Sequence, residues 1–161
     1  MGLQELPQAV HAVLQVRLDA LGHDARRLAQ AASVFGQTFW AEGVDALRTV
    51  PDVSPALAEL VRAEIAVPRH ASRFAQTTEF LFRHALVRDA AYAMLIESER
   101  RELHARAAAW LEKVGEIDPA VVGQHYESGG RPALAIAHFA RAAATALAES
   151  AFEEAERYAT R

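Results

Sequence analysis

The chain has 161 residues, 52% of them hydrophobic, and carries a formal net charge of −4. Its apolar content is enough for one ordinary core or two small ones, while the negative charge disfavours nucleic acid, whose binding surfaces are usually basic. The absence of cysteine excludes disulfides and thiolate metal sites, and no apolar run is long enough to span a membrane. We therefore expect a cytoplasmic protein with no membrane partner.

Four helices are predicted in the first half of the chain, because apolar residues recur there at intervals of three and four. Pro55 suits a first helical turn, the Ser54 hydroxyl suits an N-cap, and Gly22 is expected to end the first helix as a C′ residue. The helices, with their expected buried residues, are 6–21 (Val10, Val13, Leu14, Leu18, Leu21), 23–35 (Leu28, Ala31, Ala32, Phe35), 41–49 (Val44, Leu47) and 54–65 (Leu57, Leu60, Val61).

Two short strands are predicted next, at 65–69 and 79–82. Pro68 suits an edge strand, and Phe80 and Phe82 fall on one face of a two-residue period. Phe39 and Trp40 are expected to cover the end of the core. Helices followed by a two-stranded β-hairpin predict a winged-helix domain over residues 1–96.

After the hairpin, the spacing of the apolar residues changes from every second position to every third or fourth position. This change predicts that the strand leads into a buried helix. A second, amphipathic helix follows, with Ser98 as its expected N-cap. This stretch is interpreted as the joint between two structural units. The expected buried residues are Leu86, Val87, Ala90, Ala91, Met94 and Leu95 in the first helix, and Leu103, Ala107, Trp110, Leu111 and Val114 in the second.

The sequence of residues 97–161 predicts only helices. The predicted helix boundaries are at Gly115, Asp118-Pro119, Gly129-Gly130 and Pro132. A further helix is expected to start near Ala151, within an array that is cut or capped by a partner. The pattern predicts tetratricopeptide (TPR)-like antiparallel hairpins, and the alternative is a generic alanine-rich hairpin. Five TPR signature positions are matched in register by Gly123, Tyr126, Ala135, Phe139 and Ala142, whereas Pro119, Val122 and Leu147 depart from the signature.

Several segments also carry a family resemblance. The strings F-R-H-A-L-V-R-D-A-A-Y (82–92) and E-R-R-E-L-H-A-R (99–106) resemble the segment that closes the winged-helix domain in STAND-type signalling ATPases. Residues 6–21 and 25–36 resemble the bacterial group, which includes large transcriptional regulators and adenylate-cyclase-linked or kinase-linked regulators. The resemblance implies a regulatory region that couples ATP or ADP, bound by another domain of the same polypeptide, to a helical sensor.

The resemblance gives His84 and Arg83 an expected role. In the wider family, a histidine at the position of His84 contacts the β-phosphate of ADP in the closed state. Here Arg83-His84-Ala85 stands where better-known relatives have Met-His-Asp, so the histidine matches and the aspartate does not. A ring N–H at a strand-to-helix junction can donate to an oxyanion. The alternative is a histidine packed at a domain joint with a backbone partner.

A locally basic stretch follows, which can face a phosphate or an acidic partner domain. The alternative is a solvated helix face, in which these cations pair with Asp89, Glu97, Glu99 and Glu102. Tyr126, Phe139, Arg88 and Arg101 are the candidate interaction residues. The basic stretch comprises Arg83, Arg88, Arg100, Arg101, His104 and Arg106.

Catalytic motifs are absent: the sequence contains no phosphate loop, no G-x-S-x-G and no H-E-x-x-H. His104, His125 and His138 are too far apart in sequence to suggest a metal site. We therefore expect a non-enzymatic chain with no cofactor of its own. Its expected partners are the nucleotide-binding domain and a protein or small-molecule inducer on the helical repeats.

Two alternatives remain open. One is a stand-alone TPR-like protein-interaction module that does not depend on nucleotide. The other is a DNA-binding winged helix, which is disfavoured because the recognition-helix equivalent, 55–65, carries only Glu59, Arg62 and Glu64 as charges and no Asn or Gln.

Overall fold

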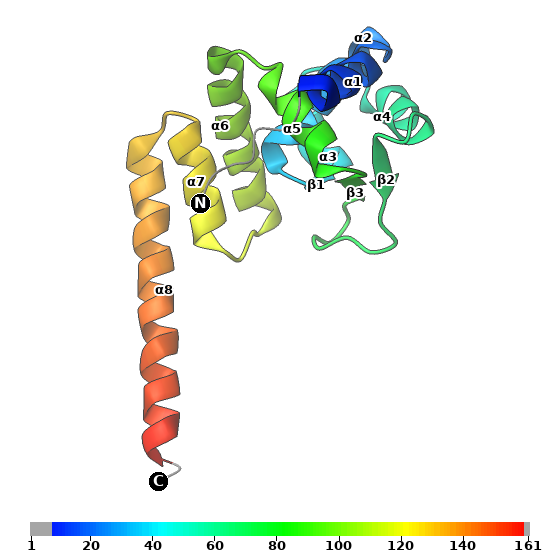
Figure 1. The fold of residues 1–161 in the computed structure, drawn as a ribbon. Helices are drawn as coiled ribbons and strands as arrows, with labels where there is room; N and C mark the ends of the chain where they lie inside the picture. Colours follow the sequence, from blue (N-terminus) through cyan, green and yellow to red (C-terminus); the bar gives the residue numbers. More distant parts are fainter. Residues whose placement is uncertain (1–7, 160–161) are drawn as a thin grey trace.

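A computed structural model describes residues 8–159, with side chains for residues 13–150 (Figure 1). Within that range the fold is mainly helical with one small antiparallel sheet, which confirms the expected class at that level. The elements are α1 (Gln8–Asp19), α2 (His23–Ala32), the 3₁₀ turn η1 (Ser33–Phe35), β1 (Thr38–Trp40), α3 (Ala41–Leu47), α4 (Val53–Arg62), β2 (Ala66–Pro68), β3 (Glu79–Phe82), α5 (Ala85–Ala93), α6 (Glu97–Val114), α7 (Pro119–Ser128) and α8 (Pro132–Ala159).

The sheet has three strands where the sequence predicts two. Its order is β1-β3-β2, both pairings are antiparallel, and Phe39 of β1 lies opposite Phe80 of β3. β1 pairs with the edge of β3 that β2 leaves free, so the backbone groups along that edge have hydrogen-bond partners. Because β1 is only three residues long, it has too few positions to show a two-residue period. β2 and β3 lie where they were predicted.

The main hydrophobic core lies among α1, α2, α3, α4, α5 and the sheet. Two valines that were predicted to be buried in the apolar faces of their helices are on the surface instead: Val13 is 61% exposed and Val61 is 36% exposed. Val10 lies outside the part of the chain whose side chains are described. The fully enclosed side chains at the centre of this core include Leu18, Leu28, Phe39, Val44, Leu47, Leu60, Phe82 and Val87.

Three predicted helix boundaries are corrected. Gly22 has a φ of −57°, so it is not a left-handed C′ residue; it precedes α2, and its N–H donates to Glu59 at 2.7 Å. The N-cap of α4 is Asp52, whose carboxylate accepts from the N–H of Ser54 at 3.0 Å. α6 starts at Glu97, so Ser98 lies inside it rather than capping it.

Helices α6, α7 and α8 form an antiparallel series, and α8 extends well beyond α7 (Figure 1). The predicted boundaries at Gly115, Asp118 and Pro132 are confirmed. A separate helix starting near Ala151 is wrong, because α8 runs without a break to Ala159. Neither Gly nor Pro occurs between residues 133 and 159, and alanine, the strongest helix former, dominates this segment.

A second hydrophobic cluster connects the sheet with α6 and α7. It contains Trp40 of β1, Trp110 and Leu111 of α6, and Val122 and Tyr126 of α7. None of the helices that the structure describes is long and apolar enough to cross a lipid bilayer.

Candidate functional site

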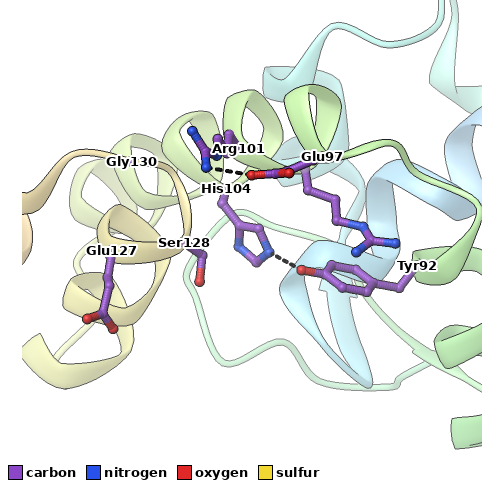
Figure 2. Close-up of a pocket in the computed structure, with 8 residues that line it drawn as sticks. Tyr92, Glu97, Arg101, His104, Glu127, Ser128 and Gly130 are labelled. Atoms are coloured by element: carbon purple, nitrogen blue, oxygen red, sulfur yellow. Dashed lines mark hydrogen bonds and ion pairs between the residues drawn. The ribbon is translucent and has the colours of Figure 1, made fainter.

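A surface cavity of about 370 Å³ opens where α5, α6 and the end of α7 meet (Figure 2). Its lining is polar and combines a phenol, an imidazole, two guanidinium groups and two carboxylates. The lining residues are Tyr92 from α5; Glu97, Arg100, Arg101 and His104 from α6; Glu127 and Ser128 from the end of α7; and Gly130 from the turn after α7.

A chain of hydrogen bonds runs inward from this cavity. The Tyr92 hydroxyl lies 2.9 Å from Nε2 of His104, and Nδ1 of His104 lies 3.0 Å from Nδ1 of His125 (Figure 2 shows the first contact). If both imidazoles are neutral, each contact has one donor and one acceptor, in either direction along the chain. The contacts thus join one side chain from each of α5, α6 and α7.

Both histidines of this chain are held in the neutral form. Burial lowers the pKa of His104 to about 4, and the Arg100 guanidinium adds to the effect. Burial likewise lowers the pKa of His125 to about 4, with a further contribution from charge on His104. At neutral pH the pair is therefore a neutral hydrogen-bonded unit in the interior.

A second polar group joins α6, α7 and α8. The carboxylate of Glu112 accepts a hydrogen bond from the Tyr126 hydroxyl and lies 2.8 Å from Nε2 of His138. Burial raises the pKa of Tyr126 to about 12, and the hydrogen bond to Glu112 and its negative charge reinforce the shift. Tyr126 is only 6% exposed, so its side chain serves the packing of these helices more directly than it serves an outside partner.

His84 lies on the surface at the position that precedes α5, with extended backbone at φ −135°. Among the described residues, no hydrogen bond joins its side chain to the start of α5. Its neighbour Arg83 is also exposed and pairs with Glu64 at 3.1 Å. Neither residue lines the cavity, but His84 and Tyr92 stand at opposite ends of the same helix.

The basic stretch is largely neutralised by ion pairs. Arg88 pairs with Asp89 at 3.1 Å, Arg101 pairs with Glu97, and Arg106 pairs with Glu102. This arrangement agrees with the alternative of a solvated, charge-paired helix face, except that Glu99 pairs with Arg27 of α2.

The remaining candidates have mixed exposure. His104 is only 9% exposed and belongs to the interior rather than to a basic surface. Arg100 stacks over the Tyr92 ring, with its guanidinium carbon 4.9 Å from the ring centroid. Arg101 is largely exposed, whereas Arg88 and Phe139 are partly buried.

The contact between His104 and His125 was missed in the sequence because the two residues are 21 positions apart. A signal was nevertheless present. His104 continues the apolar face of Ala107, Ala108 and Leu111 on one predicted helix, and His125 lies beside buried residues on the next. Polar residues on the facing stripes of a predicted hairpin indicate a buried hydrogen-bonded pair.

Comparison of the chain with protein-family models, with curated proteins and with solved structures gave no match. Within the described residues, no group of three or more histidine, aspartate or glutamate side chains is placed to hold a metal ion.

Proposed function

We propose that the chain is a non-catalytic signal-relay region of a STAND-type ATPase regulator. In this proposal, the winged-helix domain expected over residues 1–96 has its characteristic helices and strands within residues 23–82. The order of elements supports it: α2, β1, α3, α4, β2 and β3 follow one another, and the first strand pairs with the last. A winged helix has this order of helices and strands, with the loop between the last two strands as its wing.

The packing of α7 against α8 supports a TPR-like hairpin in the second part of the chain. A Cβ atom at Gly123 would lie 2.9 Å from Cε1 of Phe139, so the two helices approach where only a glycine fits. Ala135 of α8 is buried in one hydrophobic cluster with Val122 and Tyr126 of α7. Small residues opposite an aromatic ring match the predicted roles of the signature positions.

The observation that carries the relay is the path from the start of α5 to α7. His84 begins α5, Tyr92 lies near its other end, and Tyr92 is hydrogen-bonded through His104 to His125. A helix moves as a rigid rod, so displacement at His84 is transmitted to Tyr92 and then into α6 and α7. Coupling of this kind requires two states whose balance both ends influence.

The surface position of His84 suits a contact with another domain. An exposed imidazole at the start of a helix can donate to a phosphate oxygen, and the helix dipole favours the negative charge. The proposed partner is the nucleotide-binding domain of the same polypeptide, which supplies ATP or ADP. The proposed inducer, a protein or a small molecule, acts on the helical part.

The test is ADP release from the polypeptide that carries both this chain and a nucleotide-binding domain. His84→Ala is expected to speed ADP dissociation by about tenfold or more, because a hydrogen bond to a charged group contributes about 1.5–3 kcal/mol. His70→Ala removes another exposed imidazole, in the loop between β2 and β3, and serves as the control. Equal ADP dissociation rates in the wild type and the His84 variant would count against the relay.

A stand-alone protein-interaction module is the second candidate, and exposed apolar side chains on α8 favour it. Leu134, Ile136 and Leu147 are 47%, 67% and 74% exposed. Nucleic acid remains disfavoured, because the only cation on α4 is the exposed Arg62, and Glu59 of the same helix offsets its charge. If polypeptides carrying this chain lacked any nucleotide-binding domain, the interaction module would become the better proposal.

A further inference from the structure

The loop between β2 and β3, residues 69–78, packs against α6 and against the segment between α6 and α7. Phe74, in its middle, is only 6% exposed. Its ring centroid lies 4.8 Å from that of Trp40 on β1 and 5.8 Å from that of Trp110 on α6. The two tryptophan rings are themselves 5.5 Å apart, so Phe74 closes a three-ring cluster that joins the sheet to α6.

An ion pair fastens the same loop to the segment between α6 and α7. The Arg73 guanidinium contacts Glu116, whose side chain is 1% exposed. The Glu116 carboxylate also accepts from the N–H of Asp118 at 3.0 Å, next to the start of α7. If Arg73 were withdrawn, an almost fully buried carboxylate would lose its positively charged partner.

A second buried carboxylate holds the loop to the sheet. Glu79, at 6% exposure, accepts from the backbone N–H of Arg73 at 2.8 Å and from Nε1 of Trp40 at 3.2 Å. It also pairs with Arg69 at 3.3 Å. The loop is therefore attached on both sides, by Glu79 to its own sheet and by Phe74 and Arg73 to the helices.

The loop also has internal hydrogen bonds that do not depend on this attachment. The hydroxyls of Ser72 and Thr77 lie 2.6 Å apart, and Thr77 donates to the carbonyl of Phe74 at 2.8 Å. Most of its other residues are exposed, including His70, Ala75 and Gln76. Such a segment can keep its own shape while it swings away, because its internal bonds survive and the contacts that hold it closed are confined to Phe74, Arg73 and Glu79.

We propose that residues 69–78 are a strap that locks the three-stranded sheet to α6 and α7, and that the strap opens as a local step separate from unfolding. Opening uncovers Trp40 and Trp110 and frees α6 to move relative to the sheet. The closed strap also holds the Arg73 guanidinium, whose side chain is 47% exposed, on the carboxylate of Glu116. This inference rests on the contacts of the strap alone and holds whether or not the chain serves a nucleotide-bound parent.

The two tryptophans of the chain are both in this cluster, so intrinsic fluorescence reports on the strap without labelling. Phe74→Ala is expected to raise the acrylamide quenching constant at least about twofold while the far-UV circular dichroism stays native. The reason is that the substitution destabilises the closed loop and leaves the helices folded. Ala75→Ser, at an exposed position of the same loop, is the matched control and should quench like the wild type. A Phe74→Ala variant that keeps both its helical signal and wild-type quenching would overturn the proposal.

Hydrogen exchange of the unmodified chain gives a second test that needs no variant. The N–H of Arg73, bonded to Glu79, should exchange at least about tenfold faster than the N–H of Phe82, bonded to the carbonyl of Gln37, if the strap opens alone. Glu116→Gln, which removes the charge that holds Arg73, should speed exchange at Arg73 and leave Phe82 unchanged. Equal exchange at the two amides, in the wild type and in Glu116→Gln, would show that the loop opens only with the sheet and would refute a separate step.

Discussion

The Nδ1 atoms of His104 and His125 lie 3.0 Å apart in the interior between α6 and α7. Two neutral imidazoles satisfy this contact with a single proton between them. Two protonated rings would place two N–H groups against each other, so the contact limits the pair to one extra proton at most. The packing of α6 against α7 therefore depends on pH through a defined pair of atoms.

This pair predicts a loss of stability in mild acid. The pKa of each ring is about 4 in the folded chain, against an ordinary value of 6.5. Between these values the unfolded chain binds more protons than the folded chain, so the free energy of unfolding falls as pH drops from 6.5 to 4. The loss is on the order of 3 kcal/mol for each ring, and urea unfolding at a series of pH values measures it.

A histidine variant separates this effect from the titration of carboxylates. His125→Asn should lower stability at pH 7 and flatten the dependence between pH 6.5 and 4, because one titrating ring is gone. His70→Asn, at an exposed position, should keep the wild-type slope. An unchanged slope in the His125 variant would assign the acid sensitivity to other groups.

Gly123→Ala should destabilise the chain by about 1–3 kcal/mol, because the new methyl group would lie 2.9 Å from Cε1 of Phe139. Gln124→Ala, at the next, exposed position of α7, is the control and should be close to neutral. Thermal unfolding followed by circular dichroism measures both. If Gly123→Ala proved as stable as the wild type, the close approach of α7 and α8 would not hold.

Glu112→Gln should lower the pKa of Tyr126 from its value of about 12 without returning it to 10.0, since burial, the largest cause, remains. Ultraviolet titration of the phenols measures this change. Glu127→Gln changes an exposed carboxylate on α7 and should leave the titration unaltered. A Tyr126 titration that does not respond to the Glu112 variant would mean that the two side chains do not interact in solution.

Local signals in the sequence predicted most of the helices and two of the strands. Gly115, Asp118-Pro119 and Pro132 act within a few residues of their own position, so the ends they mark are readable from the chain alone. The Ser54 cap was wrong because the Asp52 carboxylate accepts from the N–H of Ser54 and is itself the N-cap, and the Ser98 cap was wrong because α6 already starts at Glu97, after the N-cap Ile96. Propensity alone does not decide between neighbouring capping groups.

The remaining features depend on contacts between distant residues. β1 exists because β3 has a second edge to fill, which no pattern within Thr38–Trp40 reveals. The polar chain from Tyr92 to His125 requires three helices to be placed together before it can be seen. The cavity beside it has the same origin, since its lining comes from three elements.

The most direct test of the relay is the ADP dissociation rate of Tyr92→Phe in the polypeptide that also carries a nucleotide-binding domain. Tyr92 lies at the opposite end of α5 from His84, and the variant removes only the hydroxyl that contacts His104. If α5 couples the two ends, the rate should change by about fivefold or more, with His70→Ala as the unaffected control. A Tyr92→Phe rate equal to that of the wild type would contradict the relay.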